Sequence, residues 1–544
     1  LAMPQADPLQ AVYLPHELST VAPPSGLGPV SVIQVVKTDT TLPGLRLGIP
    51  IDSLPEQLRP YLMLYHGLML TTDLVLPPGV VYDTEDTPLC AERWVDYTTV
   101  DRRLSELTSS SGDSIGLDAS EFAYCWIDEL YMLTMRVPER NFTVAVRWML
   151  QALVFAEFTA ERIIATAQNL LSSLRKLKQD GETMVLAAGI RLGTNCRPDQ
   201  PGWIERHISL FDQERVLSRI VNAAKADRLD EVVASLDAIR HLLIHSQGGF
   251  LALGIHASND SDRYIAAFAR EWDSCISYYA GRPLDNAAAA VPSRFAEHGP
   301  FPVARELRAP TLDAPLLVHL PLKAQQASHA RLRIATGLCS TPTDGVDFEE
   351  ELRVLPALDF FALHLLAEIL QRTDGPLSEA VRGQGYAYGV GLTAGPWWGT
   401  LVLTFHRASD VSRAILAARE VIADMDENWS NYVGDFEVAM ARSTMVYNYV
   451  AGLSTPENIM LACTENAIEG FASVEQRARW RSVHLAAVTQ ADLRRVYNKH
   501  LRRFLDPAEP VVAVIVTPLD AELLPELGAF ERKSLDDVGA YQLP

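Results

Sequence analysis

The sequence predicts an α+β protein built from two similar domains in tandem, and three observations support this. Its 544 residues exceed what a single hydrophobic core usually organises. A stretch rich in Gly, Pro and Ala, residues 281–310, divides the chain near its middle. On each side, strand patterns and long helical patterns follow one another without strict alternation, which favours mostly antiparallel sheets of about six strands. The predicted divisions are a lead-in at 1–28, a first domain at 29–280, a linker at 281–310 and a second domain at 311–544.

The first domain follows an extended lead-in, because residues 1–28 are rich in Pro, Gly and Ser and show no regular period. Residues 30–36 are a β-rich run, and residues 54–70 place apolar residues at helical spacing, with Pro55 in the first turn. Gly181 is the expected C-terminal cap of the helix at 159–179. The other expected elements are helices at 90–107, 141–155 and 230–246 and strands at 122–137 and 249–256.

The second domain repeats this theme. Residues 348–371 are mostly apolar at helical spacing and predict one long helix, and a short helix is expected at 377–382. Thr489 is a capping residue before a helix at 489–500. The other expected elements are strands at 315–322, 331–338, 386–393, 399–406 and 511–517 and helices at 411–425 and 435–454.

Composition and charge exclude several classes of function. The chain has 47 Lys and Arg against 68 Asp and Glu, a formal charge of -21, which disfavours nucleic acid and anionic lipid as partners. No apolar run reaches the ~18 residues of a membrane span, so membrane insertion is not expected. The six cysteines are widely spaced, as in proteins that keep reduced thiols. Because the chain opens at Leu1, we expect it to be processed or to be a piece of something longer.

The most informative segment is Gly375-Pro-Leu-Ser-Glu-Ala-Val-Arg-Gly-Gln-Gly-Tyr-Ala-Tyr-Gly389. A short helix delivers Arg382, glycines allow a tight turn, and Tyr386 and Tyr388 share one face of the following strand. A guanidinium and a phenol that converge at such a turn can hold a peptide carbonyl or a developing oxyanion. The alternative is that Arg382 pairs with a surface carboxylate while the tyrosines pack as edge aromatics.

This segment resembles the C-terminal half of the M16 zinc metallopeptidases, the family of pitrilysin, insulin-degrading enzyme and presequence protease. The shared pattern is Gly-Pro-Leu, then Arg382, Gly385 and Tyr388-Gly, after a long apolar helix and before two strands. The resemblance covers about residues 29–520, and parts of it are similar to an uncharacterised fungal and nematode branch close to presequence protease. The other matching segments are Leu54-Pro-Glu-Gln-Leu-Arg-Pro-Tyr-Leu62, Arg136-Val-Pro-Glu-Arg-Asn-Phe142 with Trp148, Phe158-Thr-Ala-Glu-Arg162, Lys178-Gln-Asp-Gly181 and Thr489-Gln-Ala-Asp-Leu493.

The resemblance implies a clamshell of four homologous α+β domains that encloses a peptide in a chamber. It implies a zinc ion in the N-terminal half, on a His-x-x-Glu-His motif and a distant Glu, where two His bind the metal and the intervening Glu activates water. By position in the family motif, Arg382 binds a substrate carbonyl and Tyr388 stabilises the tetrahedral intermediate.

The sequence departs from the family at the metal motif. Neither His-x-x-Glu-His nor His-Glu-x-x-His occurs in the chain. His241 and His245 lie one helical turn apart and are compatible with two metal ligands, but no Glu falls between them and no third ligand is evident, which favours structural or partner-facing histidines. We therefore expect this chain to bind no catalytic zinc and to be inactive alone. Trp397-Trp398 is expected to be a hydrophobic plug or interface, with substrate contact as the alternative.

These observations give two hypotheses. In the first, the chain is the substrate-enclosing C-terminal half of a zinc metalloendopeptidase, with peptides as substrates and a zinc-bearing N-terminal half as partner, on the same longer chain or a separate subunit. In the second, it is a non-catalytic scaffold or interaction subunit of the same fold. The joint presence of Arg382 and Tyr388 favours the first. We expect an intracellular location, the cytoplasm, with the mitochondrial matrix as the alternative.

Overall fold

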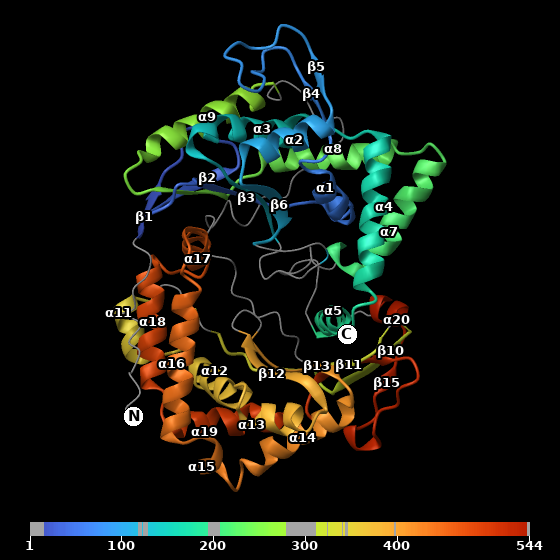
Figure 1. Cartoon of the computed structure of the whole chain (residues 1–544), viewed down its shortest axis with the longest axis vertical. Coiled ribbons are helices and arrows are strands. Elements are labelled where there is room, and N and C mark those ends of the chain that lie inside the picture. Colours follow the sequence, from blue (N-terminus) through green and yellow to red (C-terminus); the bar gives the residue numbers. More distant parts are fainter. Residues whose placement is uncertain are drawn as a thin grey trace.

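Each half of the chain forms a six-stranded, mostly antiparallel sheet flanked by helices, which confirms the predicted α+β class and the two tandem units (Figure 1). The computed structural model describes residues 16–117, 122, 129–193, 207–278, 312–323, 325–339, 341–342, 346–395 and 399–540. In Figure 1 the first unit occupies the upper half of the view and the second unit the lower half. The predicted linker at 281–310 lies outside the described residues.

The first sheet has the strand order β1-β2-β9-β3-β7-β6 and is antiparallel except at β2–β9. Its strands are β1 (His16–Val21), β2 (Val30–Thr38), β3 (Gly44–Pro50), β6 (Ser110–Ile115), β7 (Leu130–Arg136) and β9 (Gly249–His256). A small second sheet contains β4 (Asp73–Leu76), β5 (Arg93–Val95) and β8 (Ala156–Glu157). The helices are α1 (Leu62–Leu68), α2 (Tyr97–Leu107), α3 (Phe142–Phe155), α4 (Ala160–Leu177), α5 (Gly181–Gly193), α7 (Leu210–Lys225), α8 (Asp230–His245) and α9 (Ser261–Ile276).

The second sheet repeats the first. Its order from the far edge is β15-β10-β14-β11-β13-β12, and its parallel pairs are β10–β14 and β10–β15. The strands are β10 (Leu316–Leu322), β11 (Ser328–Ala335), β12 (Ala387–Gly395), β13 (Thr400–Ala408), β14 (Val512–Pro518) and β15 (Glu531–Arg532). The helices are α11 (Phe348–Val354), α12 (Leu358–Gln371), α13 (Pro376–Ser378), α14 (Val411–Asp424), α15 (Trp429–Tyr432), α16 (Asp435–Ala451), α17 (Pro456–Ile468), α18 (Val474–Ala487), α19 (Gln490–Lys499) and α20 (Leu535–Ala540).

The two units exchange one helix each. Helix α5 of the first unit packs on β11 and β14 of the second sheet, and α17 of the second unit packs on β2 and β9 of the first sheet. Both helices lie between the two halves of the molecule in Figure 1. The hydrophobic core of the first unit accordingly continues into buried residues of β10 and β14, such as Val318 and Val514. The units therefore share an interface that burial of apolar surface stabilises.

Several element boundaries differ from the sequence prediction. Residues 16–21, within the predicted lead-in, form β1, an edge strand held by backbone pairing with β2 rather than by an apolar period. The helix predicted at 54–70 is regular only at Arg59–Tyr61 and Leu62–Leu68, and the one at 90–107 only from Tyr97, which Asp96 caps. Of the strand predicted at 122–137, Leu130–Arg136 is extended.

Two further differences involve turns. The helix predicted at 348–371 breaks at Leu355, which adopts a left-handed conformation at φ +53°, so α11 and α12 meet at an angle of 61°. Gly181 does not end a helix but begins α5, because the Asp180 side chain accepts the Thr183 N–H at 2.7 Å and restarts the helical turn. No single helix of the described residues is long and apolar enough to cross a membrane, although the bent pair α11 and α12 would pass on length and composition together.

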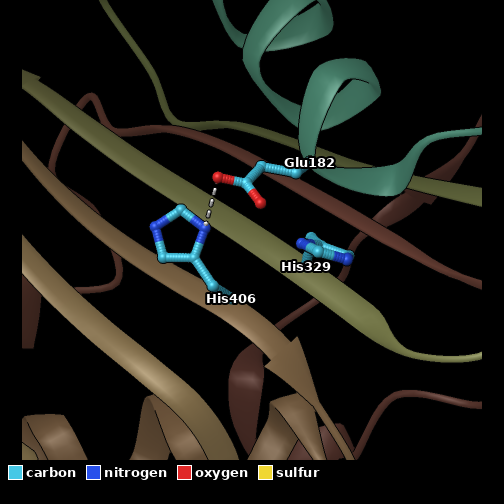
Figure 2. A group of neighbouring side chains, drawn as sticks. All are labelled: Glu182, His329 and His406. Carbon is cyan, nitrogen blue, oxygen red and sulfur yellow. Dashed lines mark ion pairs between the residues drawn. The ribbon is translucent and has the colours of Figure 1, made fainter. Parts of the chain in front are cut away.

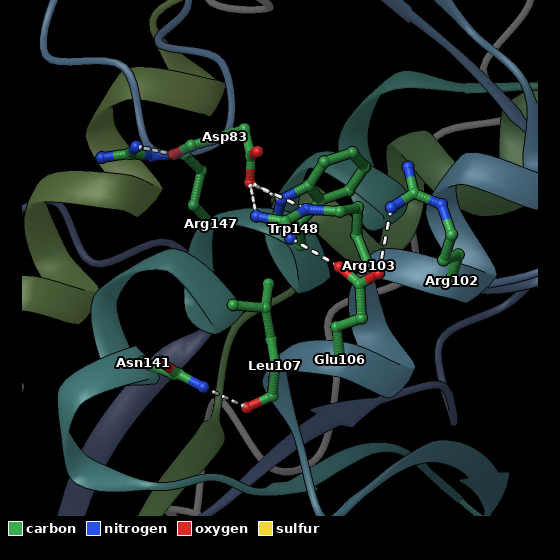
Figure 3. Close-up of polar contacts among 8 residues, drawn as sticks. All are labelled: Asp83, Arg102, Arg103, Glu106, Leu107, Asn141, Arg147 and Trp148. Carbon is green, nitrogen blue, oxygen red and sulfur yellow. Dashed lines mark hydrogen bonds and ion pairs between the residues drawn. The ribbon is translucent and has the colours of Figure 1, made fainter.

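The segment around 136–148, which the sequence analysis singled out, has structural contacts (Figure 3). The Asp83 carboxylate accepts hydrogen bonds from Arg103 Nη2 at 2.6 Å and from Trp148 Nε1 at 2.9 Å. The Asn141 side-chain amide donates to the Leu107 carbonyl at 3.1 Å and satisfies the C-terminus of α2. These contacts fasten α2 and α3 together over the first sheet.

Candidate substrate-contact site

The segment from Gly375 to Tyr388 folds as a helix, a π-helical turn and a strand. Pro376 occupies the first helical position of α13, where its missing N–H and fixed φ are favourable. The π-helical turn Glu379–Gly383 follows, and the Tyr386 N–H closes it on the Val381 carbonyl at 3.0 Å. Gly385 then takes φ +75°, a left-handed conformation that glycine adopts without strain.

The start of α14 holds this turn in place. The Ser409 hydroxyl donates to the Gly385 carbonyl at 2.8 Å, and the Ser409 and Asp410 N–H groups both donate to the Tyr386 carbonyl, at 3.0 and 3.2 Å. Tyr386 is half-buried and packs against the core of the second unit. The turn is therefore rigid on its inner side, which fixes the position at which Arg382 and Tyr388 leave it.

Arg382 and Tyr388 lie side by side at the end of the second sheet. The Arg382 Cζ atom is 5.4 Å from the centre of the Tyr388 ring, a cation–π contact, and both side chains are exposed, Tyr388 by 66%. Within the part of the chain that the structure describes, neither side chain makes a hydrogen bond or an ion pair. The surface carboxylate that the alternative interpretation assigned to Arg382 is thus not found among these residues.

The chemical capacity of this pair follows from its position. Strand β12 is an edge strand of the described sheet, because it pairs with β13 alone. An Arg guanidinium offers up to five N–H donors and is always charged, and a Tyr phenol donates one O–H. Both groups can point at one carbonyl oxygen or oxyanion of a chain that lies along the edge. Trp397-Trp398 lies outside the described residues.

His241 and His245, the other candidates from the sequence, do not form a metal site in this geometry. Their rings stack with centroids 4.0 Å apart and planes 20° apart, so the in-plane lone pairs of the nitrogens run side by side and do not converge. His245 Nδ1 lies 2.9 Å from the His241 carbonyl. Burial, with His245 and Arg240 nearby, lowers the pKa of His241 to about 4.

Two polar clusters were missed by the sequence analysis. In the first unit, Asp113 on β6 accepts hydrogen bonds from His66 Nδ1 on α1, at 2.7 Å, and from the Tyr131 hydroxyl on β7. Burial and the neighbouring Asp113 raise the pKa of Tyr131. The second cluster contains Glu182, with two histidines of the second sheet, and is described below. Members of both clusters lie on different elements, so local spacing does not reveal them.

A pocket of about 510 Å³ lies between α7 and α20 and is lined mainly by charged residues. Its cations are already paired: Arg191 with Asp212 at 3.1 Å, and Lys178 with Glu214. This pocket therefore lacks the mainly apolar lining of a typical small-molecule site, and the paired cations are already neutralised.

Comparisons with known proteins agree with the fold. No family model matches the sequence. An uncharacterized protein of Schizosaccharomyces pombe, C3H1.02c, is 21% identical over 397 residues, which are 72% of this chain and 34% of the yeast protein. The chain thus spans about a third of the length of the curated relative that it matches.

Three solved structures resemble the whole described architecture. A protease from Helicobacter pylori superposes with a TM-score of 0.60 at 10% identity over 93% of this chain and 100% of that one. An inactive peptidase M16 domain from Pseudomonas fluorescens has a TM-score of 0.58 at 14% identity over 93% and 99%. The periplasmic protease PqqL from Escherichia coli has a TM-score of 0.51 at 14% identity over 94% of this chain and 48% of its own. The chain therefore has the fold of two tandem M16-type peptidase domains.

Proposed function

We propose that the chain is the substrate-enclosing half of a zinc metalloendopeptidase of the M16 type. In this proposal a zinc-bearing half, on the same longer polypeptide or on a partner, faces the second-unit edge that carries Arg382 and Tyr388. The observation that carries the proposal is this pair, exposed, in mutual contact and without a hydrogen-bond partner among the described residues, at the end of an edge strand.

The two side chains have distinct roles in the proposed reaction. Arg382 binds a peptide carbonyl oxygen through its guanidinium and keeps the peptide chain in register. Tyr388 donates its O–H to the oxygen on which negative charge develops when the peptide carbonyl is attacked. The zinc ion, when bound on the other half, activates the attacking water. The catalytic zinc motif is absent from this sequence, so this chain's part is limited to binding and to charge stabilisation.

The comparisons support the proposal in two ways. The chain covers about half of one protease and all of a separately solved inactive M16 domain, which is the relation expected of a non-metal half. It also covers about a third of the yeast relative, which supports a longer fungal-type protein as the complete enzyme. We propose peptides as substrates, because the resemblance to the M16 family implies a chamber that encloses a peptide. We propose an intracellular site of action, because the six cysteines are widely spaced, as in proteins that keep reduced thiols.

The test is peptide hydrolysis by purified residues 1–544, alone and mixed with the zinc-bearing half. We expect no hydrolysis alone and hydrolysis on mixing. In the active mixture, Arg382→Ala and Tyr388→Phe should each lower kcat/KM by about 10²-fold, because each removes one donor to the substrate or to the oxyanion. The matched control is Tyr447→Phe, which alters an equally exposed tyrosine on α16. Equal activity of all three variants would refute the assignment of Arg382 and Tyr388.

A non-catalytic scaffold is the second candidate, and the inactive M16 domain among the similar structures favours it. A scaffold would bind the same partner with unchanged affinity in the Arg382→Ala and Tyr388→Phe variants. It would also leave peptide hydrolysis absent from the mixture, which separates it from the enzyme half.

A further inference from the structure

Glu182, His329 and His406 form a compact cluster at the contact between the two units (Figure 2). Their candidate ligand atoms all lie within 4.8 Å of one another, and no other such group of His, Cys, Asp and Glu occurs among the described residues. Glu182 comes from α5 of the first unit, whereas His329 and His406 come from the adjacent strands β11 and β13 of the second. The cluster therefore joins residues that are far apart in the sequence.

A β-bulge brings the two histidines together. Along β11 and β13, Ser328 pairs with Ala408 and Ala330 pairs with Phe405, so two residues of β13 stand opposite the single residue His329. A bulge bends its strand and redirects side chains, and bulges are frequent beside functional sites. The second bulge residue, Arg407, takes φ +49°, which is unfavourable for a side chain of its size. The sheet thus keeps an irregular backbone where His406 turns towards His329.

Glycine at position 181 allows the acidic ligand to approach. A Cβ atom at Gly181 would lie 2.4 Å from Gln325 Oε1 and 2.7 Å from His329 Cδ2, so only glycine lets α5 begin this close to the sheet. The next residue is Glu182, and its Oε1 lies 3.3 Å from His406 Nδ1, the ion pair drawn in Figure 2. The close approach of helix to strand positions the carboxylate over both imidazoles.

The histidine nitrogens are available for coordination. His329 is 6% exposed, and its Nδ1 atom is buried without a hydrogen-bond partner in the described structure, a costly state for a polar atom. An unpaired buried nitrogen beside a second imidazole and a carboxylate is the arrangement that a metal site requires.

We propose that Glu182, His329 and His406 bind a divalent transition metal, zinc by their donor set, which fastens α5 of the first unit to the sheet of the second. Two imidazoles and one carboxylate are preferred zinc ligands, and the fourth tetrahedral position is left for water. Zinc bonds of about 2.0–2.2 Å require the three ligand atoms to move closer by roughly 1 Å. The Glu182 side chain is 55% exposed and already lies 3.3 Å from His406. The site shares no residue with the pair Arg382 and Tyr388, although His406 pairs with Gly389, the residue after Tyr388, and the proposal does not depend on the proposed peptidase function.

The test is metal binding by the chain after a chelator has removed bound metal. Zn²⁺ binding is measured by calorimetric titration, and the coordination geometry is measured from the absorption bands of Co²⁺, used as a substitute ion. We expect one strong site per chain, a tetrahedral Co²⁺ spectrum and a higher midpoint of thermal unfolding with Zn²⁺. Glu182→Gln and His406→Ala should each weaken the affinity by about tenfold or more and abolish the rise in the unfolding midpoint. Glu182→Gln is exposed and nearly isosteric, so it keeps the test valid even if His406→Ala folds poorly.

The control is the double variant His241→Ala/His245→Ala, which removes the stacked pair on α8, the strongest competing imidazole pair of the first unit. It should bind Zn²⁺ as the unmodified chain does. Loss of binding in this control would overturn the proposal, as would unchanged affinity in Glu182→Gln and His406→Ala, or the absence of any strong Zn²⁺ site in the unmodified chain.

Discussion

The two units share one chain order and differ at their equivalent edges. In the first, α2 ends at Leu107, Thr108 continues in extended backbone at φ -114°, and β6 forms the sheet edge. In the second, a π-helical turn and the left-handed Gly385 precede the edge strand β12. The β6 edge directs Asp113 inward to His66, whereas the β12 edge leaves Tyr388 exposed. A repeated topology therefore provides two edges, and the connection before each helps to decide whether its polar groups are used internally or remain free.

The exchanged helices show a second contrast between the units. On the first sheet, the large residue belongs to the helix: Met460 of α17 packs against Gly44 and Gly254 of the strands. On the second sheet, the small residues belong to the helix, and Gly181 and Gly189 of α5 make room for large polar side chains of β11. The α17 contact is apolar, whereas the α5 contact combines polar side chains of β11 with apolar side chains of β14. Three measurements test these contrasts: the first concerns the α17 contact, the second the response of His364 to acid, and the third the glycine turn before β12.

The largest effect is expected from Met460→Ala. Met460 is 4% exposed and fills the space over the two strand glycines, so its truncation leaves a cavity at the apolar contact. The free energy of unfolding, measured by denaturant titration, should fall by about 2–5 kcal/mol. The added variant Gly254→Ala, whose new methyl group occupies part of that cavity, should restore a fraction of the loss. A loss below about 0.5 kcal/mol, the scale of a surface substitution, would show that α17 does not stabilise the first sheet.

The second prediction concerns how acid changes the stability of the protein through histidines on α1 and α12, the helices at corresponding places in the two units. His66 on α1 lies beside a carboxylate, whereas His364 on α12 is half-buried, and its buried Nδ1 atom has no hydrogen-bond partner in the described structure. Burial, with a smaller contribution from Arg481, lowers the pKa of His364 to about 4. The unfolded chain, with a His pKa near 6.5, therefore binds a proton first as the pH falls. The stability that the neutral ring contributes is complete above pH 6.5 and is lost progressively between pH 6.5 and 4.

This predicts a decrease of about 2 kcal/mol in the free energy of unfolding from pH 7.5 to pH 5 that is specific to His364. The measurement is the same denaturant titration at both pH values. His364→Leu should remove about this much of the pH dependence, whereas Tyr447→Phe, at an exposed position on α16, should leave it unchanged. An unaltered pH dependence in His364→Leu would mean that folding does not lower the pKa of His364.

Sequence reasoning found what is determined locally. The π-helical turn and the strand after it lie within the fifteen-residue pattern from Gly375 to Gly389, so Arg382 and Tyr388 could be singled out as one site. The long amphipathic helices, such as Ala160–Leu177 with its Thr159 cap, were equally readable, because capping and the 3.6-residue period act over one or two turns. These features depend on neighbours in the chain.

The metal-type cluster could not be found in this way. His241 and His245 stand at ligand spacing, yet their rings stack, whereas His329 and His406 are distant in sequence and meet through a bulge. The strand predicted at 331–338 begins three residues late and omits His329. Gly181 follows the helix at 159–179, and glycine is a usual C-terminal cap, whereas α5, buried on the partner sheet, lacks a strong amphipathic period that would reveal a new helix. Long-range pairing and helix exchange decided these positions.

The smallest effect is expected at the β12 turn, where two glycines provide a matched pair. Gly385 has φ +75°, and no heavy atom lies within 4 Å of the place that a Cβ would occupy, so Gly385→Ala should cost only the left-handed strain, about 1–2 kcal/mol in the free energy of unfolding. Gly389, four residues later, has ordinary strand backbone, and its nearest neighbour, His406 Cβ, would be 3.9 Å away, so Gly389→Ala should be nearly neutral. Denaturant titration of both variants separates the two cases. An equal cost at both positions would show that packing, and not the left-handed turn, sets the geometry of the edge. In that case the contrast between the β6 and β12 edges would not originate in the connection that precedes each strand.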